Sequence, residues 1–249
     1  MFMLARLVPT EAEMESLPIA RAFTLLEPGP AVLVTTNDGR RDNAMTISWT
    51  MVMDFSPTFA LTTGPWNYSY AALRDTRECV IAVPTVDMID TVVGVGTCSG
   101  KDTDKFEKFG LTRVKARHVR APLIGQCLAN IECRVVDIVE RHNILVLEGI
   151  AAYLDSARQE KRTVHAVGDG TFIVDGRRID RREMMRSKLP DGLWAPRPLG
   201  QFAATRSCLP SQRRQSDSEP EKTLRSILPL TPCDRPDPEY CQNTQSRPG

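Results

Sequence analysis

Two short stretches of this chain carry residue types that could hold a phosphorylated cofactor. Residues 43–49 read Asn-Ala-Met-Thr-Ile-Ser-Trp, and residues 99–106 read Ser-Gly-Lys-Asp-Thr-Asp-Lys-Phe. Amide and hydroxyl side chains of the first stretch can hydrogen-bond the polar edge of a heterocycle. A glycine turn with two lysines in the second stretch is typical of an anion site. Together the two stretches predict a binding site for a cofactor that carries a phosphate.

The first stretch is expected to be a β-strand with a row of hydroxyls. Side chains alternate along a strand, so Thr46, Ser48 and Thr50 would share one face and the intervening apolar residues the other. Hydroxyls on one face would recur about every 7 Å and could bind a phosphate or the carbonyl and imide edge of a ring. The alternative is a half-exposed edge strand whose hydroxyls face water.

The second stretch predicts a turn at Ser99 and Gly100 that leads into a short helix over residues 104–109. Lys101 and Lys105, four residues apart, would lie on one helix face and add positive charge to the helix start. The alternative is an ordinary capped surface helix, since Ser99 and Asp102 have the spacing of a capping box.

Other chemistry finds little support in the sequence. The glycines of residues 94–100 have the spacing G-x-G-x-x-x-G and follow an expected helix rather than a strand, which argues against a dinucleotide fingerprint. The seven cysteines form no C-x-x-C pair and the three histidines stand alone, so we expect reduced thiols and no metal site. We also find no grouping typical of a catalytic acid, base or nucleophile.

Many short strands with few helices must position these stretches. Strands are predicted at residues 31–36, from 43 onward, 58–63, 79–83, 128–139, 144–153, 164–167 and 171–174. Helices are predicted at residues 68–75, with Ser69 as a possible cap, at 85–93, with Val86, Ile89, Val92 and Val93 on one face, and at 104–109. This pattern favours a mainly β, antiparallel, Greek-key-like barrel with a few short helices.

Composition divides the chain into four parts. Residues 1–18 are expected to be a leader with a short helix from Glu11 to Ser16, and residues 19–180 the folded domain. Residues 181–206 would be an extension that packs on the barrel or on a dimer partner. Residues 207–249 are rich in Pro, Ser and Arg and lack an apolar period, which predicts a disordered tail.

The charge balance bears on partners and location. The formal net charge is only +1, which offers no electrostatic reason to expect nucleic acid or an anionic membrane as a partner. No apolar run reaches the roughly 18–20 residues that span a bilayer. The first residues make a poor signal peptide, so the cytoplasm is the expected location.

In order along the chain, the motifs resemble those of the flavin reductase-like, flavoredoxin-type family. The matching motifs are Asn43-x-Met45-Thr46-x-Ser48-Trp49, Tyr68-Ser69-Tyr70, Ser99-Gly100-Lys101-Asp102-x-Asp104-Lys105-Phe106, Ala121-Pro122-Leu123-Ile124 and the segment 127–136. The resemblance covers roughly residues 19–180. It implies an FMN-binding split β-barrel that forms a homodimer with the flavin near the subunit interface.

The resemblance also implies roles for individual positions. Asn43, Met45, Thr46, Ser48 and Trp49 would line the flavin and its ribityl phosphate, and Ser99, Lys101 and Lys105 would hold the phosphate end. Thr62 and Thr63 would contact the isoalloxazine ring, and Ser69 would also reach the cofactor. No catalytic residue and no metal ligand follow from the resemblance. One departure is the segment 64–67, Gly-Pro-Trp-Asn, where many relatives carry basic residues, so Trp66 or another residue must substitute.

The function implied is that of an FMN-binding oxidoreductase. An NAD(P)H-dependent flavin reductase would pass electrons from a reduced nicotinamide through FMN to a small-molecule or protein acceptor. One alternative is a flavoredoxin-like electron carrier without its own NAD(P)H activity. Another is a split-barrel binding module that has lost flavin.

Overall fold

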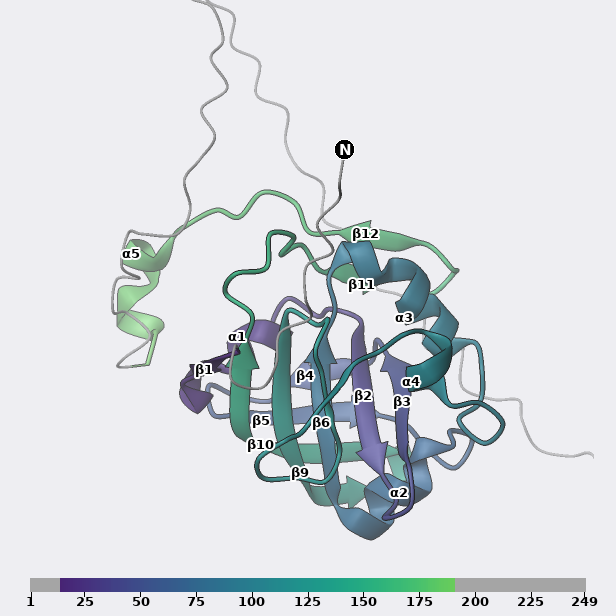
Figure 1. Cartoon of the computed structure of the whole chain (residues 1–249). Coiled ribbons are helices and arrows are strands. Elements are labelled where there is room, and N and C mark those ends of the chain that lie inside the picture. Colours follow the sequence, from purple (N-terminus) through teal and green to yellow (C-terminus); the bar gives the residue numbers. More distant parts are fainter. Residues whose placement is uncertain (1–13, 191–249) are drawn as a thin grey trace, which may run out of the picture. The chain divides into compact units, whose positions relative to one another are not determined.

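A computed structural model describes residues 14–190 of the chain (Figure 1). Most of this region is antiparallel β-structure. The strands are β1 Glu15–Leu17, β2 Val32–Asn37, β3 Asp42–Ile47, β4 Thr50–Val52, β5 Thr58–Thr62, β6 Glu78–Val83, β7 Arg113–Val114, β8 Leu123–Ile124, β9 Ala129–Val139, β10 Ile144–Leu154, β11 Val164–Ala166 and β12 Phe172–Val174.

The helices are short and lie between the strands. The α-helices are α1 Phe23–Leu26, α2 Ser69–Thr76, α3 Ile89–Gly96, α4 Lys105–Lys108 and α5 Arg182–Met185, and 3₁₀ turns span Ile19–Arg21, Val86–Met88, Glu140–His142 and Arg186–Lys188. No helix within residues 14–190 is long and apolar enough to cross a membrane.

One curled sheet dominates the fold, and its two ends are consecutive in sequence. Its strand order is β3-β2-β6-β9-β10-β5-β4, with β1 added beside β10 and every pair antiparallel. The strands β3 and β4 therefore lie at opposite ends of the sheet, and only Ser48 and Trp49 connect them. The predicted mainly β, antiparallel barrel is confirmed, and it is split where this link runs.

The β2–β3 hairpin forms because its turn residues satisfy their own backbone. The Asp38 carboxylate accepts hydrogen bonds from the backbone N–H groups of Arg40 (2.8 Å) and Arg41 (2.9 Å). These bonds lower the pKa of Asp38. Gly39 takes a φ of +88°, which an L side chain rarely adopts. The turn thereby sets the register in which Asn43 lies opposite Thr36.

Apolar residues on both faces of the sheet make two cores. Val32 and Val34 of β2 pack in the core enclosed by the curled sheet, whereas Leu33 between them packs in a second core with Val92 and Val95 of α3. β2 is thus buried on both faces, and α3 is held against the outer face of the sheet end formed by β3 (Figure 1).

The expected single strand through residues 43–51 is wrong, because the chain leaves the sheet at Ser48. β3 pairs with β2 and β4 pairs with β5, at opposite ends of the sheet, so the chain must cross from one end to the other between Ile47 and Thr50. The alternation of faces ends there. Thr46, Ser48 and Thr50 consequently do not form one row.

Two helix predictions also need correction. Glu15–Leu17, placed at the end of a leader helix, is instead strand β1, paired with Ala152–Leu154 of β10. In α3 the buried residues are Val92 and Val95, whereas Val93 is exposed. Val86 and Ile89 pack against the same core as Val92, as predicted, so only Val93 departs from the expected face, because the 3₁₀ turn before the α-helix changes its phase.

Glycines 94 and 96 serve packing, which agrees with rejecting a dinucleotide fingerprint. Both glycines lie within α3. A Cβ on Gly94 would clash with the Phe109 ring, and a Cβ on Gly96 would lie 3.2 Å from the Cβ of Thr46. They let α3 approach α4's C-terminal end and β3 closely.

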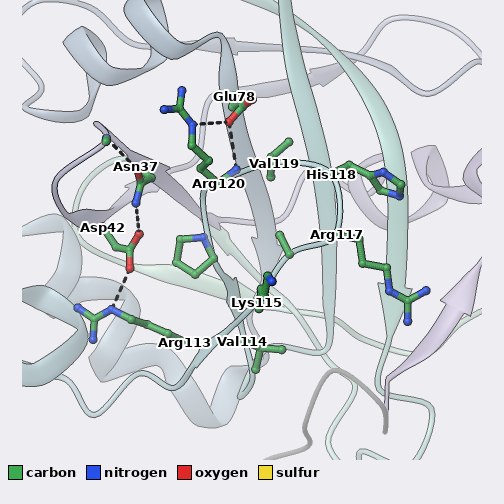
Figure 2. A pocket seen from close by; sticks show the side chains of 13 residues that line it. Asn37, Asp42, Glu78, Arg113, Val114, Lys115, Arg117, His118, Val119 and Arg120 are labelled. Atoms are coloured by element: carbon green, nitrogen blue, oxygen red, sulfur yellow. Dashed lines mark hydrogen bonds and ion pairs between the residues drawn. The ribbon is translucent and has the colours of Figure 1, made fainter.

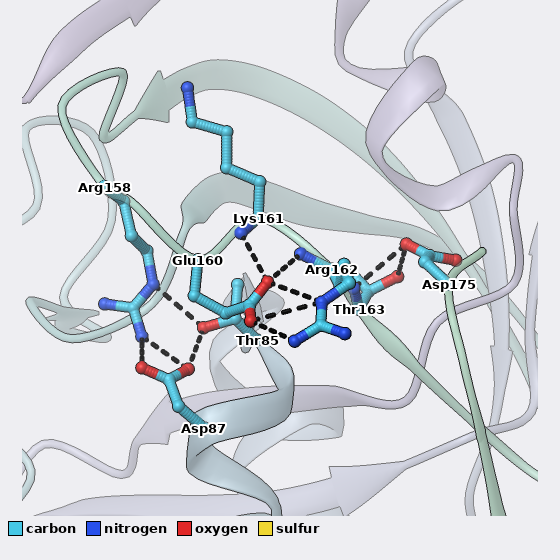
Figure 3. Close-up of polar contacts among 8 residues, drawn as sticks. All are labelled: Thr85, Asp87, Arg158, Glu160, Lys161, Arg162, Thr163 and Asp175. Atoms are coloured by element: carbon cyan, nitrogen blue, oxygen red, sulfur yellow. Dashed lines mark hydrogen bonds and ion pairs between the residues drawn. The ribbon is translucent and has the colours of Figure 1, made fainter. Parts of the chain in front are cut away.

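A polar cluster holds the segment that follows β10 (Figure 3). Arg158 donates to both carboxylate oxygens of Asp87 and, through Nε, to the Thr85 hydroxyl at 2.8 Å. Further along, Thr163 donates its hydroxyl to Asp175 at 2.7 Å. These contacts fix the β11–β12 hairpin beside the start of β2, where the Ala31 N–H donates to the Val164 carbonyl.

The domain boundaries remain predictions. Residues 181–190 include α5, in which no residue is buried, and the packing of the expected extension stays a prediction. Most of the leader, residues 191–206 of the extension and the predicted disordered tail at 207–249 lie outside the described residues. Cys79, Cys98, Cys127 and Cys133 are free thiols, as expected, and burial raises the pKa of Cys127 and Cys133.

Candidate functional site

The two stretches singled out in the sequence lie side by side in the fold. The segment from Gly96 to Gly100 runs along β3, with Gly96 against Thr46 and Gly100 against Asn43. A Cβ on Gly100 would clash with the Asn43 amide, so glycine is needed for this close approach. The contact brings the end of the glycine turn next to the start of the hydroxyl-bearing strand.

Asn43 and Ser69 belong to a buried hydrogen-bond network. The Asn43 amide donates to the Ser69 hydroxyl at 2.8 Å, and the Thr36 hydroxyl donates to the same oxygen at 3.1 Å. Ser69 is therefore not the cap of α2, whose N-cap position is Tyr68. The network ties β3 to α2 and fixes the Asn43 side chain beside Gly100.

A cavity opens where the chain crosses from β3 to β4. We call it the edge cavity; its volume is about 200 Å³, and its lining residues are Thr46, Ile47, Ser48, Trp49, Thr62, Thr63, Trp66 and Asn67. Five of the predicted site residues meet there, because the two ends of the sheet come together at this split. They are Thr46, Ser48, Trp49, Thr62 and Thr63.

Thr63 carries the clearest chemical signal in the edge cavity. Its side chain is buried, and within residues 14–190 its hydroxyl has no hydrogen-bond partner. The Thr63 N–H donates to the Asn143 carbonyl at 3.1 Å, which holds the residue in place. An unpaired buried hydroxyl costs about 1–3 kcal/mol. A polar atom of a ligand would remove this cost, so the cavity suits the carbonyl or imide edge of a flavin.

Two indoles flank the edge cavity. Trp49 lies on the link between β3 and β4, Trp66 lies between β5 and α2, and each is 66% exposed. A Cβ on Gly64 would clash with the Trp66 ring, so glycine lets this indole lie against the backbone. Exposed indoles at a cavity rim offer flat apolar walls for a planar ring system.

Thr46 is only partly available to a ligand. Its hydroxyl donates to the Val92 carbonyl of α3 at 2.6 Å, which leaves its oxygen as an acceptor. Met45 is 2% exposed and packs in the core, so its side chain does not line the edge cavity. Of the predicted strand residues, Ser48 and Trp49 are the exposed ones.

The prediction that Lys101 and Lys105 share one helix face is wrong. Lys101 lies in the turn before α4, which begins only at Lys105. Asp104 caps the helix and accepts the Glu107 N–H at 3.1 Å, so Ser99 and Asp102 are not the capping pair. Ser99 instead accepts the Lys101 N–H at 3.1 Å, closing the turn.

Lys101 and Lys105 also differ in exposure. Lys101 is exposed, and its ammonium has no partner within the described part of the chain. Lys105 is buried, and its Nζ donates to the Val95 carbonyl at 2.8 Å, where a cation suits the C-terminal end of α3. Burial lowers the pKa of Lys105. Of the two, only Lys101 is free to meet a phosphate.

Sequence reasoning missed two residues of this region. The Arg41 guanidinium stacks on the Tyr68 ring and donates to the Tyr68 hydroxyl and, at 3.4 Å, to the Lys101 carbonyl. No sequence signal marked Arg41, because its contacts with Tyr68 and Lys101 form only when the β2–β3 hairpin lies beside the glycine turn. Asn67 lines the edge cavity, and its place in the unusual segment 64–67 was the available signal.

Comparison with known proteins gives this geometry a family context. The family model described as "Flavin reductase like domain" matches residues 25–171, which is more than half of the chain. An uncharacterized protein of Archaeoglobus fulgidus is 38% identical over 111 residues, which make up 43% of this chain and 63% of that protein. The chain therefore spans a little less than two thirds of that relative's length.

Solved structures share the fold. The FMN-binding domain of a flavin reductases-like enzyme from Shewanella baltica superposes with a TM-score of 0.63 at 23% identity, over 67% of this chain and 96% of that one. Flavoredoxin of Desulfovibrio vulgaris (Miyazaki F) superposes with a TM-score of 0.57 at 24% identity, over 61% of this chain and 90% of that one.

Proposed function

Because this chain belongs to the flavin reductase-like domain family, we propose that it is an FMN-dependent oxidoreductase that takes electrons from NAD(P)H. The observation that carries the proposal is the unpartnered Thr63 hydroxyl in a cavity flanked by two exposed indoles. A buried hydroxyl without a partner is costly, and a planar ring with a polar edge satisfies both features at once.

The phosphate of FMN would bind near Ser99 and Lys101, at the other end of β3. Gly100 contacts Asn43, and Thr46 lines the edge cavity. Asn43 and Thr46 are three positions apart on β3, which corresponds to about 10 Å along the strand. A cofactor whose ring and phosphate are joined by a short ribityl chain would thus follow β3 from the cavity to the turn.

The protein's part in catalysis would be binding, orientation and polarity. Bound FMN supplies the hydride and electron transfer chemistry, so the chain needs no acid or base of its own. Thr63 and Thr62 would donate hydrogen bonds at the polar edge of the ring. Trp49 and Trp66 would cover the flat faces, and Lys101 would balance the phosphate charge.

The absorption spectrum of the purified full-length protein tests the proposal. We expect a flavin band near 450 nm that bleaches when NADH or NADPH is added without oxygen. A flavin band that neither nucleotide bleaches would favour the second candidate, an electron carrier, which the structural similarity to flavoredoxin supports. A colourless protein that binds no added FMN would contradict both and favour a binding module without flavin.

A homodimer fits the shape of the site. The edge cavity of about 200 Å³ is smaller than the roughly 300–1,000 Å³ of typical ligand pockets, which supports a second surface that helps to enclose the cofactor. The edge strand β4 and the segment after it expose the apolar side chains of Met51, Met53 and Phe55 next to Trp49. We propose that a second copy of the chain covers this surface. The cytoplasmic location and the identity of the acceptor stay predictions.

A further inference from the structure

A second, larger cavity lies between the β2–β3 hairpin and the segment 113–120 (Figure 2). We call it the hairpin cavity. Its volume is about 760 Å³, within the range of small-molecule sites. Its lining includes Asn37 and Asp42 of the hairpin, Glu78 of β6 and the whole of residues 113–120. It shares no lining residue with the edge cavity.

The segment 113–120, which we call the basic ribbon, reads Arg-Val-Lys-Ala-Arg-His-Val-Arg. Its apolar members Val114, Ala116 and Val119 are buried in a small core under the ribbon. The basic members are all exposed, because the near-alternating pattern turns them away from that core. They are Arg113, Lys115, Arg117, His118 and Arg120.

A buried carboxylate holds the basic ribbon in place. Glu132 is fully buried and accepts backbone N–H groups from Arg117 at 2.9 Å, His118 at 2.6 Å and Val119 at 3.0 Å. The Tyr153 hydroxyl donates to the same carboxylate at 2.6 Å. The backbone N–H groups of Arg117, His118 and Val119 are therefore satisfied, and the ribbon is a pre-organised surface that lines the cavity.

The acidic residues of the hairpin cavity already accept hydrogen bonds from neighbouring side chains. Asp42 accepts from Arg113 Nε at 3.1 Å and from the Asn37 amide at 2.8 Å. Glu78 accepts both the N–H and the Nε of Arg120, at 3.0 and 3.3 Å (Figure 2). Lys115, by contrast, has no ion-pair or hydrogen-bond partner among residues 14–190, nor does the His118 ring. The cavity thus holds one unpaired ammonium, that of Lys115, on the same ribbon as the His118 ring.

We propose that the hairpin cavity binds a nucleotide phosphomonoester, with Lys115 as its principal charged contact. A phosphomonoester carries close to two negative charges and three acceptor oxygens, and the unpaired Lys115 ammonium at the cavity wall is a charged donor of the kind that binds such a group. The 2′-phosphate that distinguishes NADPH from NADH is a source of this group, and this choice of source rests on the proposed function. Strand β3 links the two cavities, since Asp42 lines one and Thr46 the other, about 13 Å apart along the strand.

Calorimetry on the full-length protein tests the binding site itself. We expect 2′,5′-ADP to bind, adenosine not to bind, and affinity to fall as salt concentration rises. The variant Lys115→Ala should weaken binding about tenfold or more, the loss expected for one charged hydrogen bond. Lys108→Ala is the matched control, because Lys108 is equally an exposed lysine but does not line the cavity. Absence of 2′,5′-ADP binding, or equal weakening in both variants, would overturn the proposal.

Kinetics identify the source of the phosphate. If NADPH is the source, Lys115→Ala should raise KM for NADPH about tenfold and leave KM for NADH unchanged. An equal rise of KM for both nucleotides would overturn NADPH as the source of the phosphate. Binding of 2′,5′-ADP that depends on Lys115 would in that case still support the binding site. Lys115-dependent binding in a protein that oxidises neither nucleotide would refute the proposed function alone. Preferential binding of an oligonucleotide over 2′,5′-ADP would overturn the proposal in favour of nucleic acid.

Discussion

At the scale of single residues, the unpaired Thr63 hydroxyl is the main argument that the edge cavity binds a ligand. The Thr63 N–H donates to the Asn143 carbonyl, whereas its buried hydroxyl has no partner among residues 14–190. A buried hydroxyl without a partner costs free energy, and because Thr63 lines the edge cavity, a polar atom of a ligand would offset that cost. The Lys101 ammonium is likewise without a partner within the described residues, and it is exposed at the glycine turn.

Thr63→Val should have opposite effects on stability and on cofactor binding. Replacing the unpaired hydroxyl by a methyl group should stabilise the flavin-free protein by about 1 kcal/mol. It should weaken FMN binding about fivefold, because the ring loses a hydrogen bond. Chemical denaturation and flavin titration measure the two quantities.

Thr58→Val is the control for this experiment. Thr58 is the first residue of β5, the strand that ends just before Thr63, but its hydroxyl is hydrogen-bonded to that of Ser56 at 2.7 Å and Thr58 does not line the edge cavity. Stronger FMN binding by Thr63→Val than by the natural chain would contradict the assigned role of the hydroxyl.

Lys101→Ala should weaken FMN binding about tenfold and leave the melting temperature unchanged, because Lys101 is exposed and bonded through its backbone. Lys105→Ala should instead lower stability by about 1–3 kcal/mol, since the Val95 carbonyl would lose its buried partner. Fluorescence quenching of FMN and thermal melts separate the two effects. Unchanged affinity in Lys101→Ala would show that the turn does not bind the phosphate.

At the scale of elements, two close contacts determine whether the site forms. Gly100 lets the turn touch β3 at Asn43, and Asp104 starts α4 directly after that turn. Asp104 also pairs with Arg113 at 2.9 Å, which joins α4 to the basic ribbon. The segment between α3 and β7 therefore contacts β3 through Gly100 and the basic ribbon through Asp104.

Gly100→Ala should destabilise the protein by about 1–3 kcal/mol, because the new methyl group would displace the Asn43 side chain from its network. FMN affinity should fall with it, since the turn would move away from β3. Gly176→Ala is the matched control, for nothing lies within 4 Å of a Cβ at that position. Equal melting temperatures for the two variants would refute the close contact.

Asp104→Asn should reveal a pH-dependent contribution of the carboxylate to stability. The Glu107 N–H and, to a smaller extent, Arg113 lower the pKa of Asp104, so its charge stabilises the folded state above the ordinary aspartate pKa of about 3.9. The contribution should be a few tenths of a kcal/mol, because the pair is partly exposed.

Denaturation at several pH values measures this contribution. The natural chain should be the more stable at about pH 6, and the difference should shrink below about pH 4, as the carboxylate protonates through its lowered pKa. A difference that grows toward low pH would contradict this account of the cap.

At the scale of the whole molecule, the exposed apolar edge at β4 is the surface on which we propose that a second copy docks. β4 is an end strand of the sheet and exposes Met51 beside the edge cavity, whose own walls enclose little volume. A second copy would bury this edge and complete the cofactor site in one step. The hairpin cavity, by contrast, is built from elements of one chain.

Met51→Glu should convert the proposed dimer to monomers and weaken FMN binding, because a charge would replace an apolar side chain that is 55% exposed in the single chain. Sedimentation velocity and flavin titration measure both effects. Val136→Glu is the control, since Val136 is similarly exposed on β9, away from both ends of the sheet. A monomeric natural chain, or a dimer that Met51→Glu leaves intact, would refute the interface.

The sequence by itself determined the local structure and the residue types of the site. The β2–β3 hairpin, the short helices, the antiparallel class and the presence of hydroxyls, indoles and lysines follow from turn chemistry and side-chain period, which act over a few residues. Motif order along the chain was enough to indicate the family. These properties depend on neighbours in sequence, so a sequence can reveal them.

Only the tertiary structure decided which of those residues can reach a ligand. The predicted row of hydroxyls does not form, because β3 and β4 lie at opposite ends of the sheet. The predicted pair of phosphate-binding lysines does not form either, because the Lys105 ammonium is hydrogen-bonded to α3. The unpaired state of Thr63 and the fixed backbone of the basic ribbon both depend on residues far away in the chain, Asn143 and Glu132. Burial and hydrogen-bond satisfaction are properties of such distant contacts, and no local pattern contains them.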